Sequence, residues 1–137
     1  MKRKVIIFGL VLGVGIAVGL IVSQLINAQQ PLPKTQIILT TGLAGIEGKE
    51  GIIYIAQVFP GEVAGKHYHP GYQFSYVLEG SIIMEMEGKS PVTYKPGDAF
   101  YIPPRQVHYP RNEGNVRAKI VSFWIKEKGE PANIPVK

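Results

Sequence analysis

The stretch that decides the fold is Gly61-Glu-Val-Ala-Gly-Lys-His67-Tyr-His69-Pro-Gly-Tyr-Gln73-Phe-Ser-Tyr-Val-Leu-Glu-Gly80. At its centre, His67 and His69 are separated by one residue. Alternate side chains of a β-strand share a face, so both imidazoles can point into one cavity. Neutral imidazole is a common ligand of first-row metals, which makes the pair a candidate metal site. Two histidines spaced in this way, without further site residues, more often lie on an exposed strand or loop. The rest of the chain decides between a metal site and an exposed segment.

The residues after the histidine pair predict a hairpin. Pro70-Gly71 is typical of a turn, and Phe74 to Leu78 has the composition of a strand. This hairpin would fold Gln73 back toward the two histidines. A second stretch with regularly spaced turn residues and the third histidine follows, and it contains Gly97, Pro103-Pro104-Arg105, His108 and Asn112.

Together, the two stretches resemble the paired motifs of the cupin superfamily, with residues 81 to 96 between them. The resemblance implies an all-β fold, a double-stranded β-helix or jelly-roll barrel, over residues 35–126, with a metal near its open end. It also implies turns at Gly80 and Gly97 and a structural loop role for Asn112. The metal ligands that it implies are His67, His69, Gln73 and His108.

Gln73 departs from the family pattern, because many members have glutamate there. Three histidines and a neutral amide leave the charge of a divalent ion unbalanced, which predicts stronger Lewis acidity, a preference for an anionic substrate and lower metal affinity. The alternative is that Gln73 lies beside a three-histidine site without ligating. The expected cofactor is a divalent ion of Fe, Mn, Ni, Cu or Zn.

Arg105 is the second departure, at a position where glycine is common in the family. If the loop needs a positive φ there, arginine costs about 1 kcal/mol or more of strain. The guanidinium is a candidate for holding a substrate carboxylate at the mouth of the pocket, and the alternative is an ordinary exposed loop residue.

Composition supports one small globular domain. The chain has 137 residues, of which 45% are hydrophobic and 18% charged, and the 16 glycines and 11 prolines favour many turns over a helix bundle. There is no cysteine, which excludes disulfides and thiolate chemistry. The net charge of +5 falls to +2 without Lys2, Arg3 and Lys4, and the other basic residues form no stripe, so nucleic-acid binding is disfavoured.

Residues 1–30 form a targeting segment, with a basic start followed by the apolar run Val5 to Val22. Its length fits both a signal peptide cleaved after Ala28 and an uncleaved membrane anchor, a hydrophobic helix before the barrel, and the sequence leaves both open. Both predict a periplasmic or extracellular domain. Residues 31–34 are expected to be a linker, residues 35–126 the barrel and residues 127–137 a tail along the surface.

The last long strand is expected over Val116 to Lys126, after a loop from Tyr109 to Asn115. Its uncharged face, from Val116 to Trp124, is the one expected to point inward. Candidate substrate-binding residues are those that share a face with predicted ligands or follow the second motif: Arg105, Ser75, Val77, Ser122 and Trp124. The tyrosines near the motifs are candidates for stacking on an aromatic ligand: Tyr72, Tyr76, Tyr101 and Tyr109.

Two classes of function remain open on this sequence. One is a small metalloenzyme, dioxygenase-like or a Lewis-acid isomerase or lyase, that acts on a small molecule. The other is a non-catalytic module that binds or senses a metal or a small molecule. Edge strands of small barrels also pair between copies, so Thr35 to Thr41 is a candidate for homodimer formation.

Overall fold

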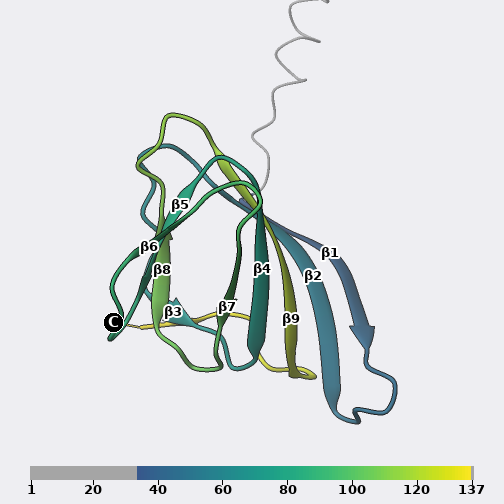
Figure 1. Cartoon of the computed structure of the whole chain (residues 1–137). Coiled ribbons are helices and arrows are strands. Elements are labelled where there is room, and N and C mark those ends of the chain that lie inside the picture. Colours follow the sequence, from purple (N-terminus) through teal and green to yellow (C-terminus); the bar gives the residue numbers. More distant parts are fainter. Residues whose placement is uncertain (1–33, 137) are drawn as a thin grey trace, which may run out of the picture. The chain divides into compact units, whose positions relative to one another are not determined.

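The computed structural model describes residues 34–136, and in this part of the chain every regular element is a β-strand (Figure 1). The targeting segment and nearly all of the predicted linker lie outside the described residues. Among residues 34–136, no helix is available that would be long and apolar enough to cross a bilayer. The strands are β1 (Thr35–Gly42), β2 (Lys49–Val58), β3 (His67–Tyr68), β4 (Tyr72–Glu79), β5 (Ile82–Met86), β6 (Val92–Tyr94), β7 (Ala99–Ile102), β8 (His108–Arg111), β9 (Ala118–Glu127) and β10 (Ile134–Pro135).

The strands form two five-stranded antiparallel sheets. One has the order β1-β2-β9-β4-β7 and the other the order β10-β3-β8-β5-β6. Most neighbours in each sheet are distant in sequence, because the chain crosses between sheets repeatedly (Figure 1). This is the all-β, double-stranded architecture that the motifs predicted.

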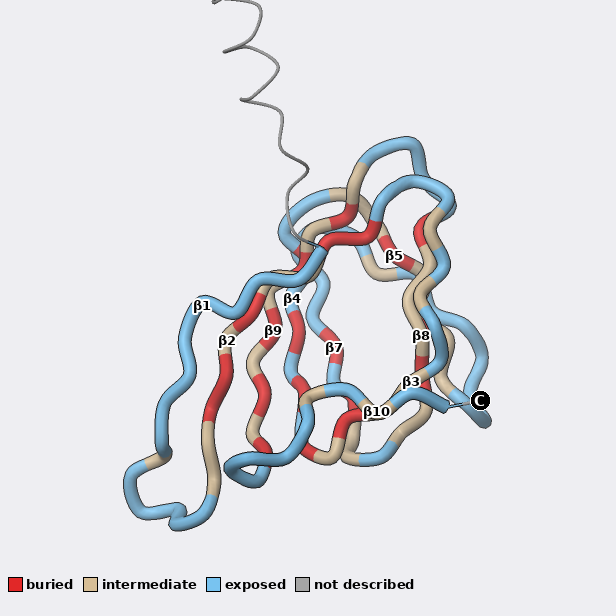
Figure 2. Tube along the Cα trace, turned by 180° about the vertical axis from the view of Figure 1, so that it is seen from behind, coloured by how far each residue is buried: buried red, intermediate tan, exposed pale blue. Residues whose placement is uncertain are grey.

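Buried residues recur along strands of both sheets (Figure 2), and their side chains form the core between the sheets. Val58, Val77, Ile82 and Ile120 are at most 6% exposed and belong to one buried cluster. On β9, Ala118, Ile120, Ser122 and Trp124 are buried, as the predicted inward face required. Val116 lies before the strand and is 57% exposed, so it is not part of that face.

Two segments differ from the sequence-based expectation. Tyr109 was expected to begin a loop, but β8 continues to Arg111 and pairs with β5. The proline at position 110 argues against a strand, because proline has no backbone N–H to donate. Its carbonyl still takes part in the backbone hydrogen bonding, since it accepts from Ala64 N at 3.0 Å. The tail was expected to run along the surface, but its residues Ile134 and Pro135 form β10 beside β3.

Two turns of the motifs require a backbone conformation with a positive φ angle. Gly80 ends β4 at φ 66°, and a Cβ there would lie 2.5 Å from the Arg117 carbonyl oxygen. Gly97 precedes β7 at φ 97°. Both angles fall in the left-handed region that favours glycine. These are the turn positions that the family resemblance implied.

Arg105 also adopts this conformation, at φ 62°, and within the described chain no other non-glycine residue has a positive φ. Arg105→Gly should therefore raise the free energy of unfolding by about 0.5–1 kcal/mol, measured by urea denaturation. Arg105→Ala is the matched control, since it removes the side chain but keeps the strain. If Arg105→Gly lowers the free energy of unfolding while Arg105→Ala leaves it unchanged, the backbone at Arg105 is not strained.

Candidate metal centre

The three histidines of the two motifs come together on one sheet. His67 lies on β3 directly opposite His108 on β8, and His69 follows the end of β3. Their candidate ligand nitrogens all lie within 4.8 Å of one another, and their ring centroids are 4.5–5.0 Å apart. The hairpin and the second motif thus build one cluster of imidazoles.

Each histidine is oriented by a backbone carbonyl at its Nδ1 atom. The Nδ1 of His67 lies 2.8 Å from Gly65 O, that of His69 2.9 Å from Ala132 O, and that of His108 2.8 Å from Gln106 O. A carbonyl only accepts hydrogen bonds, so in neutral imidazole each Nδ1 carries the proton. This tautomer leaves the Nε2 lone pair of each ring available to a metal, which is the arrangement that metal-binding histidines use.

Burial keeps two of these rings neutral. Burial is the main cause that lowers the pKa of His69 to about 4, with a smaller lowering contribution from the nearby His67. Burial likewise lowers the pKa of His108 to about 4, with smaller contributions from His67 and His69. At neutral pH both rings are therefore in the form that donates a lone pair to a metal.

Gln73 extends toward the cluster from the opposite sheet. Its Nε2 donates to Ser75 Oγ at 2.9 Å, and Ser75 Oγ lies 2.8 Å from Ser122 Oγ. Its Oε1 is buried and has no hydrogen-bond partner among the described residues. Since a buried amide oxygen without a partner is costly, the serines hold Gln73 with an acceptor that a metal or a ligand can satisfy.

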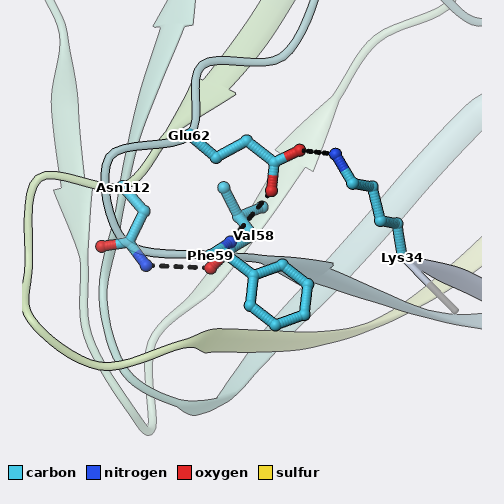
Figure 3. Close-up of polar contacts among 5 residues, drawn as sticks. All are labelled: Lys34, Val58, Phe59, Glu62 and Asn112. Atoms are coloured by element: carbon cyan, nitrogen blue, oxygen red, sulfur yellow. Dashed lines mark hydrogen bonds and ion pairs between the residues drawn. The ribbon is translucent and has the colours of Figure 1, made fainter. Parts of the chain in front are cut away.

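A cavity of about 380 Å³ lies between the sheets and is lined by all three histidines and Gln73. Its apolar lining includes Tyr54, Ile82, Met84, Phe100, Ile120 and Trp124. The acidic residue in its lining is Glu62, whose pKa is lowered by the ion pair with Lys34 Nζ at 2.5 Å and by Phe59 N (Figure 3). No free carboxylate thus faces the histidines from the described lining.

The predicted substrate-binding residues fall into two groups. Ser122 and Trp124 line the cavity, and Trp124 packs on His69 with ring centroids 4.5 Å apart. Ser75, Val77 and Arg105 do not line it. Ser75 accepts a hydrogen bond from Gln73, and Val77 is fully buried in the core. The Arg105 side chain is exposed, and the backbone N–H of Arg105 donates to His69 O at 2.7 Å.

The four tyrosines proposed for stacking do not line the cavity either. Tyr72, Tyr76 and Tyr101 are 43–46% exposed on the far side of their sheet. The tyrosine that does line it is Tyr54 of β2, opposite Ser122 in the register. Burial raises the pKa of Tyr54, so its hydroxyl stays protonated. The signal that Tyr54 lines the cavity is its position opposite the inward-facing Ser122 of β9. That position is known only once the pairing of β2 with β9 is known.

The tail is the other part of the site that sequence reasoning missed. The Ala132 carbonyl fixes the His69 ring, and Asn133 and Pro135 line the cavity. No residue type in the tail indicates this, because the contact uses a backbone oxygen and depends on β10 pairing with β3. The tail therefore helps to orient one candidate ligand and to enclose the pocket.

A chain that ends at Glu130 should retain its fold but bind Zn²⁺ about 10–100-fold more weakly, because His69 loses the partner of its Nδ1. The measurement is a competition titration with a chromogenic chelator. A chain that ends at Pro135 keeps Ala132 and β10 and serves as the control. Equal affinity in the two truncated chains would show that the Ala132 contact does not matter.

The residues present fit a divalent ion. Three oriented Nε2 atoms, two rings kept neutral by burial and one unpartnered amide oxygen converge on one cavity. Nitrogen and amide-oxygen donors suit first-row metals, and the donor set does not select one of them.

The fold and site define a class: a small double-stranded β-helix with a histidine cluster in its barrel. The chain belongs to the cupin family, because the family model described as "Cupin domain" matches residues 54–125, more than half of the chain. The match spans both motifs.

Comparisons with individual proteins agree with this family. The chain is 31% identical over 88 residues to the tetracenomycin polyketide synthase protein TcmJ of Streptomyces glaucescens, covering 64% of this chain and 57% of the relative. It spans 39–59% of the lengths of the curated relatives that it matches here. These relatives are therefore longer proteins than the matched region.

Solved structures show the same fold. DMSP lyase DddQ of Ruegeria pomeroyi matches with a TM-score of 0.62 and 21% identity, covering 74% of this chain and 50% of the lyase. An uncharacterised protein from Klebsiella pneumoniae with a double-stranded β-helix domain matches with a TM-score of 0.61 and 20% identity, covering 80% and 90%.

Proposed function

We propose that this cupin binds one divalent metal ion through His67, His69 and His108 and acts on a small molecule held in the adjoining cavity. The observation that carries the proposal is the set of three Nδ1–carbonyl contacts, which leave three Nε2 atoms free around one cavity. Gln73 is the fourth candidate ligand through its unpartnered Oε1. The bound metal would supply Lewis-acid or redox chemistry at this site.

The charge balance of the site favours a substrate with an anionic oxygen donor. Three neutral imidazoles and an amide do not offset the charge of a divalent ion. In the described lining Lys34 and Glu62 are paired with each other, and Lys66 adds a further positive charge. Such an environment stabilises an anion near the metal. The aromatic and aliphatic side chains of the opposite wall then suit an apolar body.

Polar groups on the cavity wall can orient this substrate. The Tyr54 hydroxyl lies near Ser122, Trp124 and Gln73, close enough for each to affect its pKa. Trp124 Nε1 is buried and makes no hydrogen bond of ordinary geometry with the described residues. A protonated hydroxyl and an indole N–H are donors, so both can hold a substrate oxygen.

Gln73→Glu should raise metal affinity by about tenfold or more. Two unit charges about 4 Å apart interact by about 4 kcal/mol at an effective dielectric of 20, and a divalent ion doubles this before desolvation is subtracted. The same change should destabilise the metal-free protein, since it buries a charge without a counterion. Chelator competition and urea denaturation measure the two effects.

Gln57→Glu is the matched control, because it places the same charge elsewhere in the cavity lining. If both variants raise affinity equally, the effect is general electrostatics and Gln73 is not a ligand. If Gln73→Glu leaves affinity unchanged, Gln73 lies beside a three-histidine site.

The reaction class we favour is dioxygenase-like, by family analogy, with a Lewis-acid isomerase or lyase next. The lyase named among the structural neighbours shows that this fold is used in lyase chemistry. The test loads the metal-free protein separately with Fe, Mn, Ni, Cu and Zn. Each form is assayed for oxygen uptake with phenolic carboxylates and for elimination products with acyclic carboxylates. Silence with every metal would argue against an enzyme.

A non-catalytic binding module is the second candidate. It is favoured by the scarcity of acid–base groups in the cavity: the lining carboxylate is paired with Lys34, and Tyr54 is held protonated. Ligand-induced stabilisation of the metal-loaded protein without turnover would support this function, and detected turnover would exclude it.

Action outside the cytoplasm is also part of the proposal. It is supported by the basic start and apolar run of residues 1–30, which fit either a cleaved signal or a retained anchor. Fractionation of cells that make the full chain, with N-terminal sequencing of the product, distinguishes the two. Recovery of the intact chain in the cytosol would contradict both.

A further inference from the structure

Lys126 is a buried charged residue at one end of the barrel. It is 5% exposed, and among residues 34–136 no other lysine, arginine or acidic residue is as deeply buried. On β9 it follows the alternation of Ser122 and Trp124, so its side chain points inward as theirs do. A charge at an inward position is costly unless it is paired and hydrogen-bonded, so the partners of Lys126 indicate its role.

The ammonium of Lys126 has three acceptors, one for each of its N–H groups. Glu50, its partner in the strand register on β2, accepts at 2.5 Å. The backbone carbonyls of Glu127 and Glu130 accept at 3.2 Å and 2.7 Å. Lys126 lowers the pKa of Glu50 chiefly through the first of these contacts, with a smaller lowering contribution from the backbone N–H of Gly129. Both members of the ion pair therefore hold the turn that follows β9.

This turn leads directly into the part of the tail that contacts the histidine cluster. Ala132 lies two residues after Glu130 in the sequence, and its carbonyl oxygen is 2.9 Å from His69 Nδ1. Beyond Ala132 the tail is fixed by β10, which has two residues and pairs with β3. So short a strand holds the tail only after Ala132, and the position of the Ala132 carbonyl therefore also depends on the turn before it.

Lys126 also lies against the turn that directly follows His69. A Cβ at Gly71 would be 2.7 Å from Lys126 Cβ and 2.1 Å from the Ile125 carbonyl oxygen, so the Pro70-Gly71 turn packs closely on β9. Lys126 is thus close to the segments on both sides of the His69 ring. The residues that surround one narrow gap at this end of the barrel are His69, Pro70, Gly71, Trp124, Lys126 and Ala132.

Stability alone does not require an ion pair at this position. Replacing a buried ion pair by apolar side chains of similar volume is often neutral or stabilising, because the desolvation of two charges offsets their attraction. An apolar side chain at position 126 could not donate hydrogen bonds to two backbone carbonyls. The contribution that only the ion pair makes is therefore a defined geometry of the turn.

We propose that Lys126 is a positioning residue for the metal ligand His69: with Glu50 it fixes the turn after β9, and this turn places the Ala132 carbonyl that orients the His69 ring. The inference rests on the proposed function, in which His69 binds the metal through Nε2. Neither Lys126 nor Glu50 lines the cavity, so the effect of the pair on the metal site runs through the tail.

The test replaces the pair as a unit, Glu50→Gln with Lys126→Met, because removal of the lysine alone would leave a buried carboxylate unpaired. The matched control is Lys49→Met with Glu127→Gln. This ion pair lies one position along the same two strands, and its side chains point outward.

The first readout needs no metal. In the metal-free full-length protein, in mild detergent, the nitrogen chemical shifts of the His69 ring report which nitrogen carries the proton. Wild type and control should show the single tautomer with the proton on Nδ1, since Ala132 O accepts from it. The paired variant should show a mixture of the two tautomers. A merely structural role of Lys126 would lower stability without changing the tautomer.

Competition with a chelator for Zn²⁺ is the second readout. The paired variant should bind Zn²⁺ about tenfold more weakly than wild type, as expected for loss of a group that orients a ligand, and the control should bind as wild type does. Lys126→Gln, which keeps N–H donors without the charge, is the second variant if the paired one does not fold. Its affinity should lie between that of wild type and a tenfold loss.

A tautomer or a Zn²⁺ affinity that is unchanged in the variant overturns the inference, and so does an equal loss in the control. If wild type itself binds no Zn²⁺, the proposed function fails, and the tautomer alone then decides whether Lys126 positions His69.

Discussion

Replacing His108 by alanine is expected to remove the stabilisation of the protein by divalent metal. The side chain is 2% exposed, and its Nδ1 faces the Gln106 carbonyl, so its free Nε2 points into the cluster of imidazoles. Without it, two histidines and an amide remain. Wild type in metal at 100 times its Kd should gain about 2.7 kcal/mol of stability, and His108→Ala should gain almost none.

The measurement is urea denaturation with and without Zn²⁺ or Mn²⁺. Met84→Leu is the matched control, because Met84 also lines the cavity and leucine preserves its volume without removing a nitrogen donor. His67→Ala should behave as His108→Ala does. Equal metal-dependent stabilisation of wild type and both histidine variants would show that the cluster is not the binding site.

Asn112→Ala is expected to lower the free energy of unfolding by about 2–4 kcal/mol, because it leaves several backbone groups without partners. Asn112 is 1% exposed. Its Nδ2 donates to Val58 O at 2.9 Å (Figure 3). The same Nδ2 donates to Val116 O at 2.9 Å, and the Oδ1 accepts from Gly114 N at 2.8 Å. The side chain therefore ties the end of β2 to the loop after β8.

Backbone contacts of the same residue reinforce this tie. Gly61 N donates to Asn112 O at 2.8 Å, and Asn112 N donates to Glu62 O at 2.9 Å. Asn115→Ala, on the exposed part of the same loop, should change stability by no more than about 0.5 kcal/mol. Urea denaturation of both variants checks the prediction, and similar small losses for the two would disprove a structural role for Asn112.

The two motifs were sufficient to predict the sheets and the histidine cluster because together they resemble the paired motifs of the cupin superfamily, while parts of each motif follow from local spacing. His67 and His69 alternate within one hairpin, and the turns at Gly80 and Gly97 need the backbone that glycine supplies. The inward face of β9 followed from its pattern of uncharged residues. The alternation of His67 with His69 and the inward face of β9 can each be recognised from a few neighbouring residues in the sequence.

The parts that sequence reasoning missed depend on contacts between distant segments. Tyr54 reaches the cavity because β2 pairs with β9, and Ala132 reaches His69 across 63 residues through a backbone oxygen. The tyrosines near the motifs were assigned to the pocket by proximity in sequence. Those on β4 lie on the opposite face because Gln73 and Ser75 occupy the inward positions of the strand.

The most direct test of the account is the metal stoichiometry and affinity of the wild-type chain. Metal-free protein is titrated separately with Fe²⁺, Mn²⁺, Ni²⁺, Cu²⁺ and Zn²⁺ by calorimetry, and bound metal is counted by elemental analysis after desalting. We expect one ion per chain for at least one of these metals, with one proton or fewer released per ion at pH 7, since burial already keeps His69 and His108 neutral. Failure of all five metals to bind would contradict the central claim that His67, His69 and His108 form a metal site.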